Sequence, residues 1–354
     1  MESRSDDEAL TAELNELIEG AGITGQRSLI RRVLATGLGL GQDRTSRLNL
    51  KITAAALEEM RAAFRLFDPF AGTPKVTIFG SARTQSHDPL WHEAEQVSRR
   101  LAEQGWMVVT GAGPGIMEAA ATGAGPEQSL GVSIRLPFEQ VPEHLHANGD
   151  RLVSMKYFFT RKLMLIKESL GFVCLPGGFG TMDETFELLT LQQTGKMVPV
   201  PIVLLDRPGG TFWQGFEQFI SEHLERIGVI SPGDLDRVLV TDSVDAAVEE
   251  ITGFWRNYDS LRWDREKLVL RLRAEPSDAE INELNERFGD MLIEGRIERT
   301  EPLPVERSDG DMLDLPRIVL VPEQRAVGRL HLLIRALNGL SSAPKTLDTP
   351  SVEV

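Results

Sequence analysis

The chain has 354 residues, of which 41% are hydrophobic and 26% are charged, and its formal net charge at pH 7 is −15. This composition is typical of a globular protein and excludes a chain that is mainly disordered or collagen-like. The acidic balance makes nucleic-acid backbones and anionic membranes poor partners, although a local cradle of backbone N–H groups can still bind a small anion.

The sequence also argues against membrane insertion, secretion and metal binding. No apolar run is long enough to span a bilayer, and the first ten residues lack the basic and apolar segments of a secretory signal. The single cysteine, Cys174, excludes an intrachain disulfide, and we interpret it as a buried apolar residue. His144 and His146 have no further ligand at a convincing spacing, so we interpret them as loop residues. We therefore expect a cytoplasmic protein without a metal site.

The first 70 residues predict a helical N-terminal extension. Apolar residues recur at helical spacing over residues 8–69. The glycines at 37, 39 and 41 predict a break in this segment, and Pro69 marks its end.

From residue 71 to residue 258, short apolar segments alternate with helical patterns. Such alternation indicates βαβ units, and strands without polar alternation indicate a sheet that is covered on both faces. We therefore predict an α/β fold with a Rossmann-like parallel sheet and helices on both faces. Strands are predicted over residues 75–79, 106–109, 129–136, 171–175 and 201–205. Helices are predicted over residues 88–104, 115–124, 155–169, 181–194 and 211–227.

Beyond Tyr258 the pattern changes to that of a small α+β region over residues 259–340. It is either an appendage or an elaborated edge of the main domain. The capping-box spacing of Ser277 and Glu280 predicts a helix start. Strands are predicted over 267–273 and 317–321, a second helix over 328–339, and a disordered tail over 341–354.

Two glycine-rich loops carry the chemical signal. TGAGPGIME (110–118) and PGGFGTMDE (176–184) each lie between a predicted strand and a predicted helix. Glycine lets a ligand approach the backbone closely, and the helix N-terminus offers free N–H groups and a positive dipole end. Both loops would lie beyond the carboxyl ends of parallel strands, where ligands bind. A plain tight turn is the alternative for either loop, but two such loops in one sheet favour a phosphate site.

Two common nucleotide motifs do not match these loops. A dinucleotide fingerprint needs a third glycine where Ile116 stands, and the strand predicted over 129–136 lacks a terminal ribose-binding acid. A P-loop fails because Gly195-Lys196 is followed by Met197. We therefore expect a mononucleotide or a sugar phosphate as the ligand.

The residues alone leave the roles of the charged side chains open. Thr181 and Glu184 have the spacing of a capping box, in which the carboxylate bonds back to the backbone. Spacing alone favours that cap over a carboxylate that faces a ligand. Arg161 and Lys162 fit the pattern of a solvated helix face.

Taken together, the motifs resemble the LOG family, whose members were long labelled lysine decarboxylases. PGGFGTMDE (176–184) is similar to the family motif PGGxGTxxE. The segments Gly80–Arg83, 110–120, Met155–Met164 and Glu187–Lys196 agree with the family in order and spacing. The resemblance covers about residues 70–256, and the helical lead-in is similar to that of longer bacterial members.

This resemblance implies an enzyme that hydrolyses the N-glycosidic bond of a nucleoside 5′-monophosphate, AMP-like or a cytokinin ribotide, to free base and ribose 5-phosphate. It implies a homodimer or higher homo-oligomer and no cofactor. It also implies that Arg161 and Glu184 are catalytic, with Glu184 near the ribose and the oxocarbenium-like state. The implied substrate-binding residues are Ser81, Gly113, Gly115, Met117, Glu118, Lys162, Gly177, Gly178, Gly180 and Thr181.

Two alternatives remain at this point. A non-catalytic nucleotide or cofactor carrier on the same fold, such as a molybdenum-cofactor carrier, would need the phosphate loop but not Arg161 and Glu184. A regulated nucleosidase would use the region after residue 260 to sense an effector. Presence of both Arg161 and Glu184 favours the enzyme.

Overall fold

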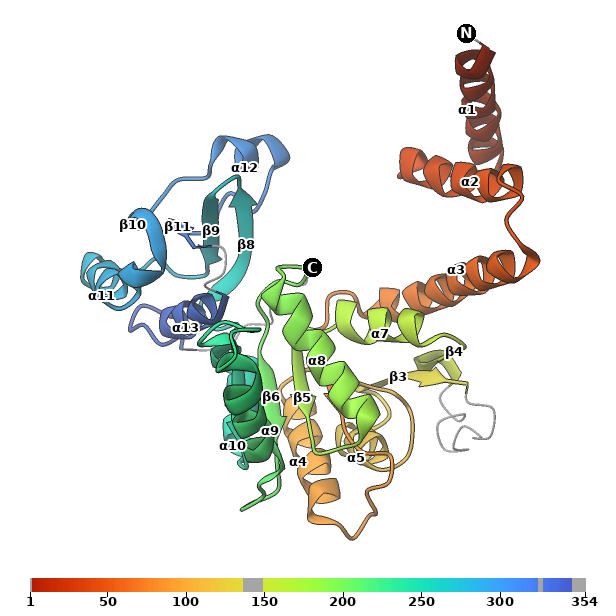
Figure 1. Cartoon of the computed structure of the whole chain (residues 1–354). Coiled ribbons are helices and arrows are strands. Elements are labelled where there is room, and N and C mark those ends of the chain that lie inside the picture. The colour runs from red at the N-terminus through yellow and green to blue at the C-terminus, as the bar shows by residue number, and fades with distance from the viewer. Residues whose placement is uncertain (1, 136–148, 324–326, 346–354) are drawn as a thin grey trace. The chain divides into compact units, whose positions relative to one another are not determined.

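A computed structural model describes residues 2–135, 149–323 and 327–345 of the chain (Figure 1). The chain divides into two compact units, Met1–Met60 and Arg61–Val354. Among the described residues, no helix combines the length and apolarity that a bilayer span requires. His144, His146 and most of the predicted tail lie outside the described residues, and the predicted domain boundaries stay predictions.

The first unit is helical. It contains α1 (Glu2–Gly20), α2 (Arg27–Gln42) and the first part of α3 (Arg47–Phe67). The predicted break at the glycines of residues 37, 39 and 41 is wrong, because α2 runs through all three and ends at Gln42. An isolated glycine weakens a helix by about 1 kcal/mol without ending it, and none of these three has a positive φ.

The second unit contains a seven-stranded parallel sheet in the order β4-β3-β2-β1-β5-β6-β7. Its strands are nearly all buried, which is why they read as apolar runs. The chain moves outward from β1 through β2 and β3, then returns to the other side of β1 at β5. The strands are β1 (Lys75–Phe79), β2 (Met107–Thr110), β3 (Ser129–Ile134), β4 (Leu152–Met155), β5 (Gly171–Cys174), β6 (Ile202–Leu205) and β7 (Val238–Thr241).

Helices cover both faces of this sheet, as predicted. Because parallel crossovers are right-handed, this reversal at β1 puts the helices of the two halves on opposite faces. One layer is formed by α4 (Pro89–Glu103), α5 (Ile116–Ala124) and α10 (Val244–Gly253). The other is formed by α7 (Phe158–Lys167), α8 (Phe179–Gln193) and α9 (Phe212–Phe219) (Figure 1).

Three elements of this sheet region differ from the sequence predictions. The helix predicted over 155–169 begins only at Phe158, because residues 152–155 form β4 and pair with β3. Neither β7 nor α10 was predicted. The remaining predicted strands and helices of this region are present with shifts of a few residues at their ends.

The C-terminal residues form a second sheet, antiparallel, in the order β10-β11-β9-β8. In the described part of the chain, no strand of it pairs with the parallel sheet, so the appendage alternative is correct. Ser277 and Glu280 form the predicted capping box at the start of α11. The elements are β8 (Tyr258–Asp264), β9 (Lys267–Leu272), α11 (Asp278–Phe288), β10 (Leu292–Arg299), α12 (Pro304–Asp309), β11 (Arg317–Pro322) and α13 (Val327–Asn338).

Candidate active site

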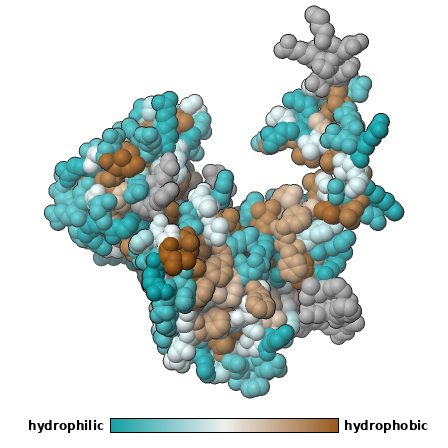
Figure 2. Space-filling model, in the orientation of Figure 1, coloured by the Kyte–Doolittle hydropathy of each residue, from teal (hydrophilic) through white to brown (hydrophobic). Residues whose placement is uncertain are grey.

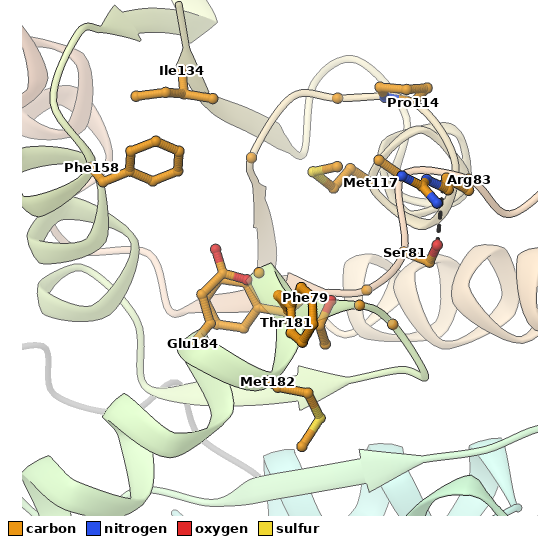
Figure 3. Close-up of a pocket in the computed structure, with 18 of the residues that line it drawn as sticks. Phe79, Ser81, Arg83, Pro114, Met117, Ile134, Phe158, Thr181, Met182 and Glu184 are labelled. Atoms are coloured by element: carbon orange, nitrogen blue, oxygen red, sulfur yellow. Dashed lines mark hydrogen bonds between the residues drawn. The ribbon is translucent and has the colours of Figure 1, made fainter. Parts of the chain in front are cut away.

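A cavity of about 920 Å³ lies at the carboxyl edge of the parallel sheet (Figure 3). Its residues come from the ends of β1 and β3, from both glycine loops and from α7, α8 and α9. Strand β1 is the switch point of the sheet, with one glycine loop after its neighbour β2 and the other after its neighbour β5. A crevice at such a point is the usual ligand position in open parallel sheets.

Ser81, just after β1, ties the two glycine loops together. Its N–H donates to the carbonyl of Pro176 at 3.3 Å, and its carbonyl accepts from the N–H of Ile116 at 3.0 Å. Its hydroxyl accepts from the N–H of Arg83 at 3.1 Å (Figure 3). The first loop needs glycine at the contact point, because Gly115 has φ 71° and an added Cβ would lie 2.4 Å from the Ser81 carbonyl oxygen.

The second glycine loop opens directly into α8. Gly178 is the N-cap and supplies no side-chain cap, so the first N–H groups of the helix keep their hydrogen-bonding capacity for a ligand. An added Cβ at Gly178 or Gly180 would meet nothing within 4 Å. The loop therefore leaves room for an anion at a positive helix end.

The capping-box interpretation of Thr181 and Glu184 is wrong. The helix begins at Phe179, so Thr181 lies within its first turn rather than at its N-cap. The Thr181 side chain is buried, and its carbonyl accepts from the hydroxyl of Thr185 at 2.8 Å. The Glu184 carboxylate points into the cavity instead of back toward the helix start (Figure 3).

Arg161 lines the cavity and is anchored by two backbone carbonyls. Its Nε donates to the carbonyl of Val132 at 2.9 Å, and its Nη2 donates to the carbonyl of Gly111 at 3.4 Å. These carbonyls belong to β3 and to the loop after β2. The solvated-face interpretation of Arg161 is therefore wrong, since the residue is only 8% exposed. Burial lowers the pKa of Arg161, but a guanidinium stays protonated in proteins.

Glu184 faces this guanidinium without a close hydrogen bond to it. Its Oε1 lies 3.6 Å from Nη1 of Arg161. Burial raises the pKa of Glu184 to about 7, although the positive charges of Arg161 and Lys162 oppose the change. A carboxylate that gains and loses its proton near neutral pH, beside a fixed cation, is suited to acid–base or electrostatic catalysis.

An apolar wall completes the cavity, and the sequence reasoning missed it. It contains Ile134, Met182 and five phenylalanines. The rings of Phe186 and Phe216 lie 5.5 Å apart. A signal was present in the spacing of residues 212, 216 and 219, which places three phenylalanines on one face of α9. The phenylalanines of the wall are Phe158, Phe186, Phe212, Phe216 and Phe219.

Most of the predicted site residues meet at this cavity. Gly115, Glu118 and Lys162 do not line it: Gly115 and Glu118 lie at the start of α5, and Lys162 contacts Asp183 and Glu187. The predicted residues that line the cavity are Ser81, Gly113, Met117, Arg161, Gly177, Gly178, Gly180, Thr181 and Glu184.

Two further features concern the single thiol and the residue types that bind metals. Cys174 is fully buried, and burial raises the pKa of its thiol to about 12, so it is not a nucleophile at neutral pH. Within the described residues, no group of three or more His, Cys, Asp or Glu side chains is arranged to hold a metal ion.

Comparisons with known proteins agree with the motifs in the two loops. A family model described as "Possible lysine decarboxylase" matches residues 116–251. The chain is 30% identical to the cytokinin riboside 5′-monophosphate phosphoribohydrolase of Mycobacterium tuberculosis over 171 residues, 47% of this chain and 88% of that protein. It is also 30% identical to the enzyme of the same name from Rhodococcoides fascians over 183 residues, 51% of this chain and 90% of that protein.

Among solved structures, the molybdenum cofactor binding protein of Rippkaea orientalis is similar over 50% of this chain and 94% of that one. Its identity is 20% and its TM-score is 0.36, a similarity too remote to support an argument about function. The relatives that are 30% identical over nearly their whole length are the stronger finding. The chain therefore belongs to the LOG family.

Proposed function

We propose that this protein hydrolyses the N-glycosidic bond of a nucleoside 5′-monophosphate and releases the free base and ribose 5-phosphate. The observation that carries the proposal is the pair of Arg161 and Glu184, which lines the same cavity as a helix N-terminus suited to phosphate and an apolar wall suited to a base. The names of the relatives, cytokinin riboside 5′-monophosphate phosphoribohydrolases, support this reaction class.

The 5′-phosphate would bind at the start of α8. Gly178 and Gly180 leave open space for the phosphate to approach the backbone, and Gly177 would border it while making room for the Thr181 side chain. The free N–H groups and the helix dipole favour the charge of the phosphate. Thr181 and Ser81 border the same end of the cavity and would add hydroxyl contacts. Gly113 and Met117 would border the ribose, and Gly115 and Glu118 would support that loop from outside the cavity.

Glu184 would act on the ribose. In hydrolysis, the C1′–N bond breaks and its electron pair leaves with the base nitrogen, which takes up a proton. A water oxygen forms the new bond to C1′ and loses a proton, which balances the one that the base gains. The transition state carries positive charge on the ribose ring, which an ionised Glu184 stabilises. Arg161, fixed by two backbone carbonyls, faces the Glu184 carboxylate and would assist the leaving base.

The phenylalanine wall would hold the base. Its aromatic and aliphatic side chains form an apolar part of the same cavity that the glycine loops border. Aromatic faces stack on any planar base, so the wall favours a nucleotide over a simple sugar phosphate without fixing which base is preferred.

We also propose that the chain works as a homodimer. Figure 2 shows apolar side chains gathered over α7, α8 and α9 on the face in view. Phe158, Phe159 and Phe219 are each about half exposed, and Phe179 is almost fully exposed. Contiguous apolar surface of this kind is typical of an interface. Sedimentation equilibrium tests this, and a monomer at micromolar concentration contradicts it.

Base release from a panel of nucleotides tests the reaction. The purified chain is incubated with AMP, GMP, IMP, CMP, UMP and isopentenyladenosine 5′-monophosphate, and free base is measured by chromatography. We expect release from at least one nucleotide. Glu184→Gln and Arg161→Met should each lower kcat at least 100-fold, and Lys196→Met, on an exposed turn, is the matched control. Tight nucleotide binding without release would instead support a carrier.

A further inference from the structure

Lys162 follows the buried Arg161 on α7, yet it contacts a different set of side chains. Its Nζ lies 2.7 Å from Oδ2 of Asp183 and 2.8 Å from Oε2 of Glu187. The Lys162 side chain is only 16% exposed. Such a lysine is not a freely solvated surface charge.

These two partners bracket the candidate catalytic carboxylate. Asp183 precedes Glu184 by one residue, and Glu187 follows it by one helical turn on α8. Arg161 faces Glu184 from α7, one residue before Lys162. Adjacent residues of α7 therefore form ion pairs with three acidic side chains of α8, and the relative placement of the two helices sets the distance between Arg161 and Glu184.

The charges around Glu184 come from both helices. Burial is the largest cause of the raised pKa of Glu184; among the charges, Arg161 and Lys162 on α7 lower that pKa, and Asp183 and Glu187 on α8 raise it. The Cys174 thiol of β5, the titratable group behind α8, stays neutral because of its high pKa. Without Lys162, two unneutralised carboxylates would flank Glu184 and favour its protonated form.

We propose that Lys162 is a positioning residue that joins α7 to α8 through Asp183 and Glu187, and so favours the ionised form of Glu184 and keeps it facing Arg161. This inference rests on the proposed hydrolysis for its kinetic readout. It replaces the expectation that Lys162 binds the substrate. A simple surface ion pair is the alternative, and such pairs contribute about 0–1 kcal/mol to stability and nothing to a pH profile.

The pH dependence of kcat distinguishes these roles. Base release is measured from pH 5 to pH 9 for the wild type, Lys162→Met, Lys162→Arg and the control Lys196→Met. We expect Lys162→Met to move the acidic midpoint of kcat upward by about one pH unit, because Glu184 then holds its proton more tightly. At pH 7 this corresponds to a loss of about fivefold in kcat. The Michaelis constant should change less than about twofold, and Lys162→Arg should restore most of the wild-type midpoint.

Two results would overturn the inference. A large rise in KM with an unchanged midpoint would place Lys162 on the substrate, and an unchanged profile would reduce its pairs to surface contacts. A cooperative thermal unfolding transition, measured for each variant, serves as the control that the variant is folded.

A second measurement keeps the inference separable from the proposed function. If the wild type releases no base from any nucleotide, the proposed hydrolysis fails, but the titration of Glu184 can still be followed by NMR of protein labelled with ¹³C at glutamate side chains. The Glu184 carboxyl should then titrate about one pH unit higher in Lys162→Met than in the wild type. Equal titration midpoints would contradict the positioning role directly.

Discussion

Glu184 in the parallel-sheet region is a largely buried carboxylate and Glu306 in the C-terminal sheet region is a fully buried one. Both face arginines, but their surroundings differ. Oε1 of Glu306 accepts from Nε and Nη2 of Arg271 at 3.0 and 2.9 Å and lies 2.8 Å from Nη1 of Arg317. Its Oε2 accepts from the N–H of Leu303 at 2.9 Å. Glu184 has one guanidinium nitrogen at 3.6 Å and an open cavity.

The two pKa shifts show the consequence of this difference. Desolvation raises the pKa of Glu306, but its bonds to Leu303, Arg271 and Arg317 outweigh that effect and the net shift is downward. Desolvation dominates at Glu184, and the pKa rises to about 7. A buried carboxylate whose oxygens are all hydrogen-bonded typically has a structural role. A largely buried carboxylate that has few hydrogen bonds and faces a cavity is a candidate for a catalytic role.

Removing the charge of Glu306 should have the largest effect on stability. Glu306→Gln leaves Arg271 and Arg317 buried without their shared anion, and we expect the free energy of unfolding to fall by about 3–5 kcal/mol. Urea denaturation measures this, with the exposed Glu301→Gln as control. A loss below about 1 kcal/mol would mean that the cluster is not the structural counterpart of the Arg161–Glu184 pair.

Substitution in the glycine loop after β2 should cause the next largest loss of stability. Gly115→Ala puts a Cβ against the Ser81 carbonyl at a positive φ, so we expect a loss of about 2–3 kcal/mol. Gly178→Ala meets no atom within 4 Å and should change stability by less than about 1 kcal/mol while raising KM, because its methyl group would intrude on the proposed phosphate position. Equal stability losses would contradict this separation of fold and site.

His331 provides a pH-dependent contrast in the C-terminal region. It is fully buried beside the ring of Phe254, and neither ring nitrogen has a hydrogen-bond partner among the described residues. Burial, and then the nearby charges of Arg335 and Arg237, lower its pKa well below 6.5. The unfolded chain therefore binds the proton more readily, and stability falls as the pH drops below about 6.5.

The size of this effect follows from proton linkage. Between pH 6.5 and pH 5.5 the wild type should lose about 1 kcal/mol more than His331→Leu, which has no proton to bind. Unfolding free energies of both proteins at several pH values provide the difference curve. A difference in unfolding free energy that does not change with pH would show that the His331 imidazole is solvated or hydrogen-bonded in solution.

Neutralising Glu184 should have the smallest effect on stability. Burial already disfavours its charge, so Glu184→Gln should keep the free energy of unfolding within about 1 kcal/mol of the wild type at pH 8. The loss of the weak contact with Arg161 offsets the relief of desolvation. Urea denaturation of this variant and of Glu306→Gln compares the two carboxylates directly. Similar losses of unfolding free energy in both variants would contradict the proposed difference between them.

The features that could be predicted from the sequence are those that depend on residues close together in the chain. Uniformly apolar strands and the two glycine loops identify the parallel sheet and the place of the site, because both depend on neighbouring residues. The same local signals placed the start of α8 two residues late, since the Thr181 and Glu184 spacing imitates a capping box. Gly178 at the N-cap makes the earlier start possible.

Features that depend on tertiary contacts could not be predicted from the sequence. The phenylalanines of α9 read as an ordinary helix face, and only the packing of α9 beside α8 turns them toward the cavity. The pattern of residues 155–169 looked wholly helical, yet pairing with β3 makes its first residue the end of a strand. Lys162 matched a substrate-binding motif, and only the position of α8 reveals its two acidic partners.

The pH dependence of base release by the wild type and by Glu184→Gln tests the central claim most directly. Because the reaction is proposed to need ionised Glu184, kcat of the wild type should rise through a midpoint near pH 7. The folded Glu184→Gln protein should be at least 100-fold slower at every pH between 5 and 9. A variant that keeps most of the wild-type rate, or a wild-type profile that is flat across this range, would contradict the claim that this carboxylate performs the chemistry.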